Sequence, residues 1–311
     1  MRRAAIVVLG AILLAAAGAQ ALPASSRPQW TAVGLRVLHL VDGTRSIRLP
    51  GGRLEPRPLV TYVRYPALGR LSAGDVLDAP PDRAAGPFPL VVFGHGFAVT
   101  PATYAHLLRA WARAGFVVAA PVFPLGNANA PGGPDEADRI NQPADLGFVI
   151  TSLLAESATP GDPLYGMVDT TRIAVAGHSD GADTALAAAF SRHLRDPRID
   201  AAVVLSGAEM TGVRDYDFGP GGPALLAVQG SADTLNPPHY TYDYFAKAAR
   251  PKFLLVLPGA RHLAPYTWQQ PQRAEVERVT IAFLDHYLAN QPLSRLLASG
   301  EKGLGALTAD P

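Results

Sequence analysis

A serine flanked by glycines is the part of this sequence whose residue types most directly suggest chemistry. The pentapeptide Gly-His-Ser-Asp-Gly, residues 177–181, stands between an apolar run, 172–176, and an alanine-rich stretch, 182–190. A glycine two positions to either side of a serine, between a buried strand and a helix, lets the backbone bend so sharply that the hydroxyl stands clear of the sheet. The pattern predicts that Ser179 is a nucleophile. Because such a short pattern also occurs by chance, the prediction needs partners elsewhere in the chain.

A serine hydroxyl becomes a good nucleophile when an imidazole takes its proton and a buried carboxylate orients that imidazole. Asp233 follows the apolar run 224–228, and His262 follows the apolar run 253–257. Both therefore stand in loops after predicted strands, as Ser179 does. The order serine, aspartate, histidine predicts Asp233 as the orienting acid and His262 as general base, then general acid.

Other residues compete for these two roles. Asp215 and Asp217 follow the preceding predicted strand and are the alternative acids. The remaining histidines of interest stand in or beside predicted helices, where surface or capping roles are more typical: His106, His193, His239 and His286.

A tetrahedral oxyanion needs fixed backbone donors. One expected donor is the amide of Asp180, directly after the serine, and the other is the amide of Phe97, which follows the glycine-containing loop 94–96. The alternative for that loop is a plain tight turn. The Asp180 side chain is harder to place, since a carboxylate near a developing anion is unfavourable. We expect it to point away and to be stabilised by the helix dipole.

Strands and helices alternate from residue 89 onward, which predicts an α/β fold with a mostly parallel sheet and helices on both faces. Such sheets place reactive groups at the carboxyl ends of their strands. The apolar runs predict eight strands, at 33–41, 59–65, 90–93, 116–120, 172–176, 199–205, 224–228 and 253–257. Helices are predicted at 101–114, from 143 to about 154, at 182–190 and from 271.

The first two strands predict an antiparallel hairpin, 33–65, at one edge of the sheet, with turn signals at Asp42-Gly43 and at 50–52. Only 18 residues separate Leu205 from Ala224, too few for a folded cap domain, so the cleft should be open. The domain is expected to span 22–290, and 291–311 are expected to form a loosely held tail.

The first 21 residues resemble a secretory signal, with Arg2 and Arg3, an apolar run 4–19, and small residues at Ala19 and Ala21. We expect cleavage after Ala21 and a secreted or extracytoplasmic protein, a retained N-terminal anchor being the alternative. The run is shorter than a membrane-spanning helix requires.

Composition narrows the function further. Of 311 residues 48% are hydrophobic, which suits a packed core, and the absence of cysteine excludes disulfides. Without the two arginines of the signal, the 27 basic residues become 25 against 26 acidic ones, so no clustered positive charge favours a nucleic acid partner. No cofactor is implied, because the serine mechanism needs none and no histidine cluster has metal-ligand spacing.

Taken together, these segments resemble the α/β-hydrolase superfamily, and in particular its dienelactone hydrolase-like, platelet-activating-factor acetylhydrolase-like and cutinase-like esterases. The resemblance rests on residues 173–181, the His95-Gly96 loop, residues 139–150, the loops of Asp233 and His262, and the strand end Val63-Arg64-Tyr65-Pro66. It implies carboxylic ester hydrolysis through an acyl-serine. Two departures bear on substrate: polyester-degrading relatives usually carry methionine after the serine and a C-terminal disulfide, and a typical dienelactone hydrolase has a cysteine nucleophile.

The expected pocket wall is apolar, which favours acyl or aryl esters over charged substrates. It combines Phe97, Ala98, Val99, Ala208, Met210, Leu263, Tyr266 and Trp268. The sequence leaves open a cutinase-like polyester hydrolase, a lipase, and a catalytically silent binding protein on the same scaffold.

Overall fold

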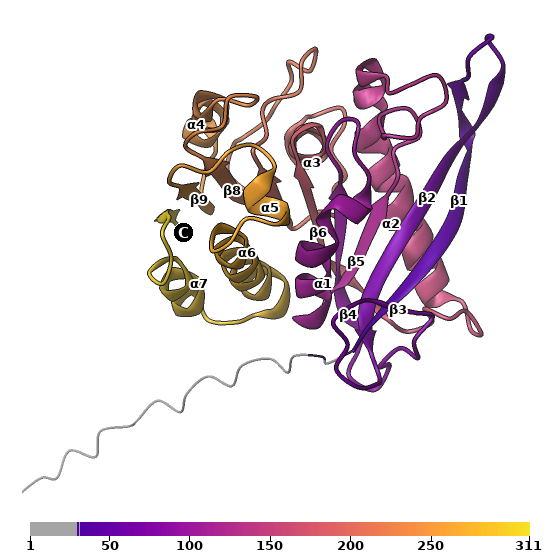
Figure 1. Ribbon diagram of the computed structural model, residues 1–311, viewed down its shortest axis with the longest axis horizontal. Helices are drawn as coiled ribbons and strands as arrows, with labels where there is room; N and C mark the ends of the chain where they lie inside the picture. The colour runs from indigo at the N-terminus through magenta and orange to yellow at the C-terminus, as the bar shows by residue number, and fades with distance from the viewer. Residues whose placement is uncertain (1–29, 31) are drawn as a thin grey trace, which may run out of the picture.

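The computed structural model describes Trp30 and residues 32–311, so the predicted signal peptide, 1–21, lies outside the described residues. One ten-stranded sheet runs through the described part, with helices on both sides (Figure 1). Its strands are β1 (Ala32–Arg48), β2 (Leu54–Ala67), β3 (Val76–Leu77), β4 (Phe88–Gly94), β5 (Val117–Pro121), β6 (Val168–His178), β7 (Ala201–Leu205), β8 (Ala224–Gly230), β9 (Lys252–Leu257) and β10 (Ala306–Asp310).

Helices connect these strands. They are η1 (Pro101–Tyr104), α1 (Ala105–Arg113), η2 (Glu136–Asn141), α2 (Gln142–Ala158), α3 (Asp180–Phe190), α4 (Pro238–Lys247), α5 (Ala264–Thr267), α6 (Gln272–Ala289) and α7 (Leu293–Gly300), η1 and η2 being 3-10 helices. None of the helices in the described part is long and apolar enough to cross a membrane.

The strand order is β10-β9-β8-β7-β6-β4-β5-β2-β1-β3. From β5 through β4 to β9 all neighbours are parallel, whereas β1–β2, β2–β5 and β9–β10 pair antiparallel. The prediction of a mostly parallel sheet is confirmed, with ten strands rather than eight. The additions are the two-residue β3 and the C-terminal β10, both at sheet edges.

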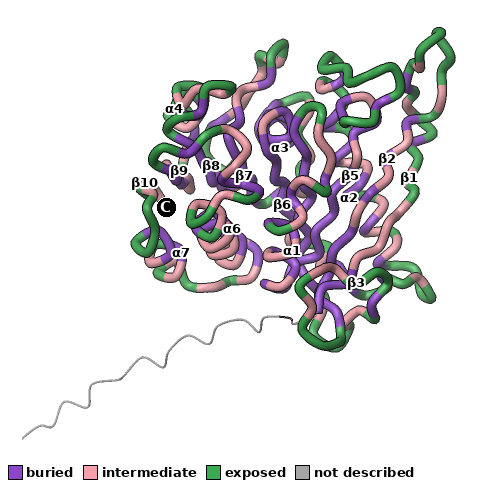
Figure 2. Tube along the Cα trace, in the orientation of Figure 1, coloured by how far each residue is buried: buried purple, intermediate pink, exposed green. Residues whose placement is uncertain are grey.

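Two hydrophobic layers cover the sheet, because side chains alternate along each strand. In β4, Leu90 and Val92 belong to the layer that contains α2 and α3, whereas Val91 and Phe93 belong to the layer of α1 and α6. Figure 2 shows the resulting distribution, with the central strands buried and the tip of the β1–β2 hairpin exposed. Continuous apolar runs form these central strands because both of their faces are covered.

The hairpin is longer than its sequence signals predict. β1 continues through Asp42-Gly43 to Arg48, and the pairing with β2 shifts register between Asp42 and Ser46. The Asp42 carboxylate accepts bonds from the amide and hydroxyl of Thr44, which stabilises this irregularity. The first turn signal therefore marks a β-bulge, and the chain reverses at 50–52.

The prediction of a loose tail is wrong. Residues after 291 form α7 and β10, and β10 pairs antiparallel with β9. The buried Glu275 carboxylate accepts the backbone amides of Leu304 and Gly305, which fixes the approach to β10. The local sequence does not predict β10, because its partner strand, β9, lies about fifty residues earlier in the chain.

Candidate active site

Ser179 occupies a one-residue corner between β6, which ends at His178, and α3, which begins at Asp180. Its backbone has φ 56° and ψ −125°, a conformation that is strained for a residue with a side chain. A Cβ at Gly177 would overlap the backbone of Gly181, and a Cβ at Gly181 would overlap the carbonyl of Gly94. Both glycines are thus required by close approach, and the corner presents the serine hydroxyl at the carboxyl end of the sheet.

The structure brings Ser179, His262 and Asp233 together. The Ser179 Oγ lies 2.9 Å from Nε2 of His262, and Nδ1 of His262 lies 2.8 Å from Oδ2 of Asp233. The serine hydroxyl can donate to Nε2 while Nδ1–H donates to the carboxylate, which is the tautomer a general base needs. Loops after β6, β8 and β9 supply the three side chains, so the parallel sheet itself makes them converge.

Asp233 is held as a carboxylate. Its other oxygen, Oδ1, accepts the backbone amides of Leu235 and Asn236, each at 3.0 Å. Burial opposes ionisation, but the hydrogen bond and charge of His262 and the Asn236 amide outweigh it and lower the pKa of Asp233 below its ordinary value. The side chain is therefore available as a negative charge to stabilise an imidazolium at His262.

The rival residues lie elsewhere. Asp215 bonds Ser191 and His193, and Asp217 contacts Arg192. His286 contacts the carbonyl of Gln291 within the C-terminal part, and His239 packs on the ring of Tyr240 at the start of α4.

The two expected oxyanion donors border the same cavity as Ser179. Phe97 and Asp180 both line it, and the Asp180 amide stands at the first position of α3, where a helix offers no internal acceptor. The loop that carries Phe97 is anchored by the buried His95, whose Nδ1 contacts the Gly96 carbonyl and whose Nε2 accepts the Phe123 amide. Burial lowers the pKa of His95 to about 4, so the ring is neutral at pH 7 and can accept that bond.

His178 contributes a connection that sequence reasoning missed. Its Nδ1 lies 2.8 Å from the hydroxyl of Tyr104, which also accepts the Gly96 amide at 3.3 Å. Its Nε2 lies 2.9 Å from the backbone carbonyl of His262. The residue before Ser179 thus links the loop of Phe97 to the loop of His262. Its place beside Ser179 was the available signal, but no local sequence pattern identifies its partners.

Asp180 has a partner that the sequence did not reveal. Nη1 of Arg139 in η2 lies 2.9 Å from Oδ1 of Asp180 and 3.1 Å from Oδ2 of Asp183. The expectation of an acid in the first helical turn is met, but an ion pair holds the carboxylate, in addition to any helix-dipole effect.

The cavity at Ser179 has a volume of about 360 Å³ and mainly apolar walls. Of the expected wall residues, Phe97, Val99 and Leu263 line it. Tyr266 is buried, Met210 is almost fully buried and borders a separate cavity, and Trp268 is exposed outside the cavity of Ser179. Ala208 borders a neighbouring polar cavity, and Ala98 lines neither. Unpredicted members are Tyr104, Glu136, Leu235 and Asn236.

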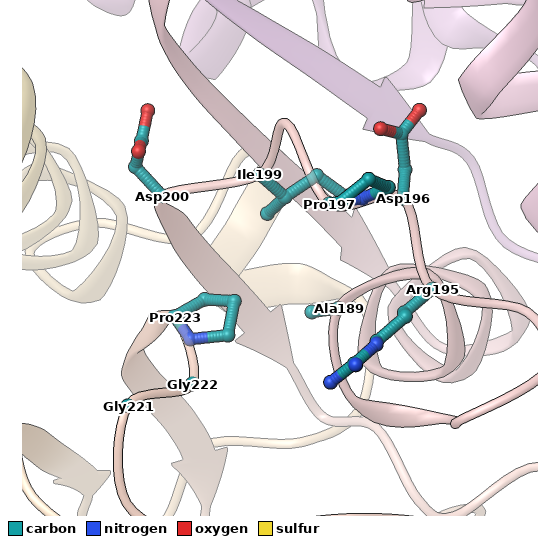
Figure 3. Close-up of a pocket in the computed structure, with 9 residues that line it drawn as sticks. All are labelled: Ala189, Arg195, Asp196, Pro197, Ile199, Asp200, Gly221, Gly222 and Pro223. Carbon is teal, nitrogen blue, oxygen red and sulfur yellow. The ribbon is translucent and has the colours of Figure 1, made fainter.

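A second cavity, of about 420 Å³, lies at the amino ends of the parallel strands, opposite the end that carries Ser179. Asp200, which precedes β7, and Pro223, which precedes β8, line it (Figure 3). Figure 3 shows the carboxylates of Asp196 and Asp200 pointing away from the Arg195 guanidinium. No serine, threonine or histidine lines it, so it offers no nucleophile and base pair. Within residues 30 and 32–311, no group of three or more histidine, aspartate or glutamate side chains is arranged to hold a metal ion.

Comparison with known proteins finds a solved structure of similar fold. The ferulic acid esterase of Streptomyces cinnamoneus has a similar solved structure, with a TM-score of 0.64 and 23% sequence identity over 86% of this chain and 94% of that one. This protein has the α/β-hydrolase fold. The α/β-hydrolase sheet carries Ser179, Asp233 and His262 in the connections that follow the carboxyl ends of its strands.

A family model described as Chlorophyllase matches residues 74–209 of this α/β-hydrolase-fold chain. The matched segment contains the Phe97 loop, Arg139 and Ser179, and ends before Asp233. No match was found among curated protein sequences.

Proposed function

We propose that this protein is a serine carboxylic ester hydrolase that acts on apolar acyl or aryl esters through an acyl-serine. The observation that carries the proposal is the chain of hydrogen bonds from Ser179 through His262 to Asp233, of which Ser179 and His262 line an open, mainly apolar cavity. Similarity to a structure named an esterase and to an esterase family model supports ester hydrolysis as the reaction class.

In the proposed acylation step, Oγ of Ser179 attacks the ester carbonyl carbon while its proton passes to Nε2 of His262. The carbonyl oxygen becomes an oxyanion, which accepts hydrogen bonds from the backbone amides of Phe97 and Asp180. As the tetrahedral intermediate collapses, the bond to the alcohol breaks and His262 returns the proton to the leaving oxygen. Water then attacks the carbonyl carbon of the acyl-serine while one of its protons passes to Nε2 of His262. Collapse of this second tetrahedral intermediate breaks the bond to Oγ of Ser179, His262 returns the proton to Oγ, and the carboxylic acid leaves.

The lining of the cavity supports uncharged substrates. Phe97, Val99, Leu235 and Leu263 offer apolar contact, whereas Glu136 places a carboxylate at its edge. A carboxylate at the edge disfavours substrates that carry a negative charge close to the scissile bond. The short 206–223 connection between β7 and β8 contains no helix that could cover the cavity.

The direct test is turnover of p-nitrophenyl butyrate by the wild-type protein and by Ser179→Ala. We expect Ser179-dependent hydrolysis and covalent labelling of Ser179 by a fluorophosphonate. Equal turnover by both proteins refutes the serine mechanism, and absence of labelling supports the alternative of a silent binding protein. Hydrolysis of polymer films in the same assay separates a cutinase-like enzyme from one restricted to soluble esters.

We also propose export of the protein with removal of residues 1–21. The support is the sequence pattern of two arginines, an apolar run and small residues before Pro23. Mass spectrometry of the protein recovered from culture medium tests it, with an N-terminus at Leu22 as the expected result.

A further inference from the structure

The side chain of Asp180 poses an electrostatic problem for the proposed reaction. Its backbone amide is an expected donor to the oxyanion, yet the same residue carries a carboxylate and lines the cavity of Ser179. A negative charge at this position raises the energy of a developing oxyanion, because Coulomb interactions are strong where water is excluded. Something must offset it.

Arg139 supplies the opposite charge. A single nitrogen, Nη1, lies 2.9 Å from Asp180, 3.1 Å from Asp183 and 3.5 Å from Glu136. The Asp180, Asp183 and Arg139 side chains are largely buried, with 11%, 6% and 16% of their surface exposed, so solvent screens the ion pairs weakly. Burial raises the pKa of both aspartates above the ordinary value, to about 7 for Asp183, and the charge of Arg139 acts against this rise.

The η2 helix that carries Arg139 is anchored without help from that side chain. Asp138 of η2 binds the buried Arg57 of β2 at 2.7 Å, and Asp135 caps η2 by accepting the Ala137 amide. Replacing Arg139 should therefore leave η2 in place and change mainly the charge beside α3.

We propose that Arg139 is a positioning residue that offsets the negative charge of the Asp180 carboxylate, so that the oxyanion beside Ser179 forms next to a partly compensated charge and not a bare one. This inference rests on the proposed serine esterase function. It concerns the transition state, since the oxyanion is absent from bound substrate, and so it predicts an effect on kcat more than on KM.

The contact geometry identifies charge as the important property. Because one guanidinium nitrogen makes all three contacts, the planar fork of arginine is not required here, and an ammonium can replace it. Arg139→Lys should keep kcat within about threefold of the wild type, whereas Arg139→Gln should lower kcat about tenfold or more with little change in KM.

A rescue experiment separates this role from a structural one. Removing the charge of residue 180 should make Arg139 unimportant for turnover, so Arg139→Gln/Asp180→Asn should recover the kcat of Asp180→Asn alone. The matched control is Arg139→Gln/Asp183→Asn, which removes the other buried carboxylate. An asparagine at 183 can still accept the Ala208 amide that Asp183 Oδ1 accepts at 2.7 Å. This control should recover thermal stability but not kcat.

The kcat values of these variants test the inference directly. Wild-type kcat in Arg139→Gln, or equal recovery by the Asp180 and Asp183 double variants, overturns the inference while Ser179-dependent turnover remains. Wild-type turnover that Ser179→Ala does not lower overturns the proposed function and the inference with it.

Discussion

Nε2 of His178 lies 2.9 Å from the backbone carbonyl oxygen of His262, so the residue before Ser179 holds the loop that carries His262. The ring packs against the imidazole of His262, with 4.6 Å between centroids, and its other nitrogen, Nδ1, lies 2.8 Å from the Tyr104 hydroxyl. As the neutral Nε2–H tautomer, His178 donates to the His262 carbonyl and accepts the Tyr104 hydroxyl proton at Nδ1. Burial, together with the positive charge available at His262, lowers the pKa of His178 to about 3, which keeps the ring neutral.

This burial predicts a pH-dependent contribution to stability. The unfolded chain binds a proton at His178 near the ordinary value of 6.5, whereas the folded chain does so only near 3. The buried, neutral His178 therefore contributes fully to the free energy of unfolding above pH 6.5, and this contribution is lost as the pH falls toward 3. Between about pH 6 and 4 the wild type should lose about 1.4 kcal/mol of unfolding free energy per pH unit more than His178→Gln.

Urea unfolding at several pH values measures this difference. Other titrating groups, including Asp183, contribute to both proteins and cancel in the comparison. His193→Gln is the control, because the His193 side chain is 85% exposed. Parallel curves for wild type and His178→Gln would contradict the assignment of a neutral buried ring.

Asp233→Asn should lower kcat by about a thousandfold or more with little change in KM. An amide at 233 can still accept from the Leu235 and Asn236 backbone, but it cannot offset the charge of a protonated His262. Steady-state kinetics on p-nitrophenyl butyrate measure the effect. Asp215→Asn, the acid bonded to Ser191 and His193, should leave kcat unchanged, and the reverse pattern would exchange their roles.

Gly181→Ala should prevent stable folding or lower the free energy of unfolding by more than about 3 kcal/mol, because its new Cβ overlaps the carbonyl of Gly94. At Gly43 nothing lies within 4 Å of an added Cβ, so Gly43→Ala should change stability by less than about 1 kcal/mol. Thermal unfolding of both variants provides the comparison. Equal melting temperatures would mean that the elbow can widen without loss.

Arg57 is the centre of a buried ion cluster that joins the β1–β2 hairpin to η2 and α2. It binds Asp145 through Nε at 2.7 Å and Asp138 through Nη2 at 2.7 Å. Arg57→Met should destabilise the protein by about 3 to 5 kcal/mol, because two buried carboxylates lose a shared partner. Arg53→Ala, whose side chain is 71% exposed, should have little effect. Chemical unfolding of the two variants tests whether the cluster stabilises the fold.

The sequence by itself determined the elements that continuous patterns encode. Apolar runs become the central strands because both of their faces are covered, and the glycines around Ser179 specify the elbow because no other residue fits there. Because the strands before Ser179, Asp233 and His262 are parallel, all three residues must lie at the carboxyl ends of the strands, on the same side of the molecule. That topological consequence allowed three residues distant in the chain to be predicted as neighbours.

Only the tertiary structure decided the contacts made between segments with no shared pattern. The pairing of Arg139 with Asp180, the bond from His178 to the His262 carbonyl and the entry of Leu235 into the cavity depend on how loops pack. The strand at 306–310 likewise exists because the edge of β9 offers it backbone partners. Hydrophobic periodicity is a local property that the sequence shows directly. Ion pairs and the pairing of an edge strand depend instead on distances between segments that only the folded chain determines.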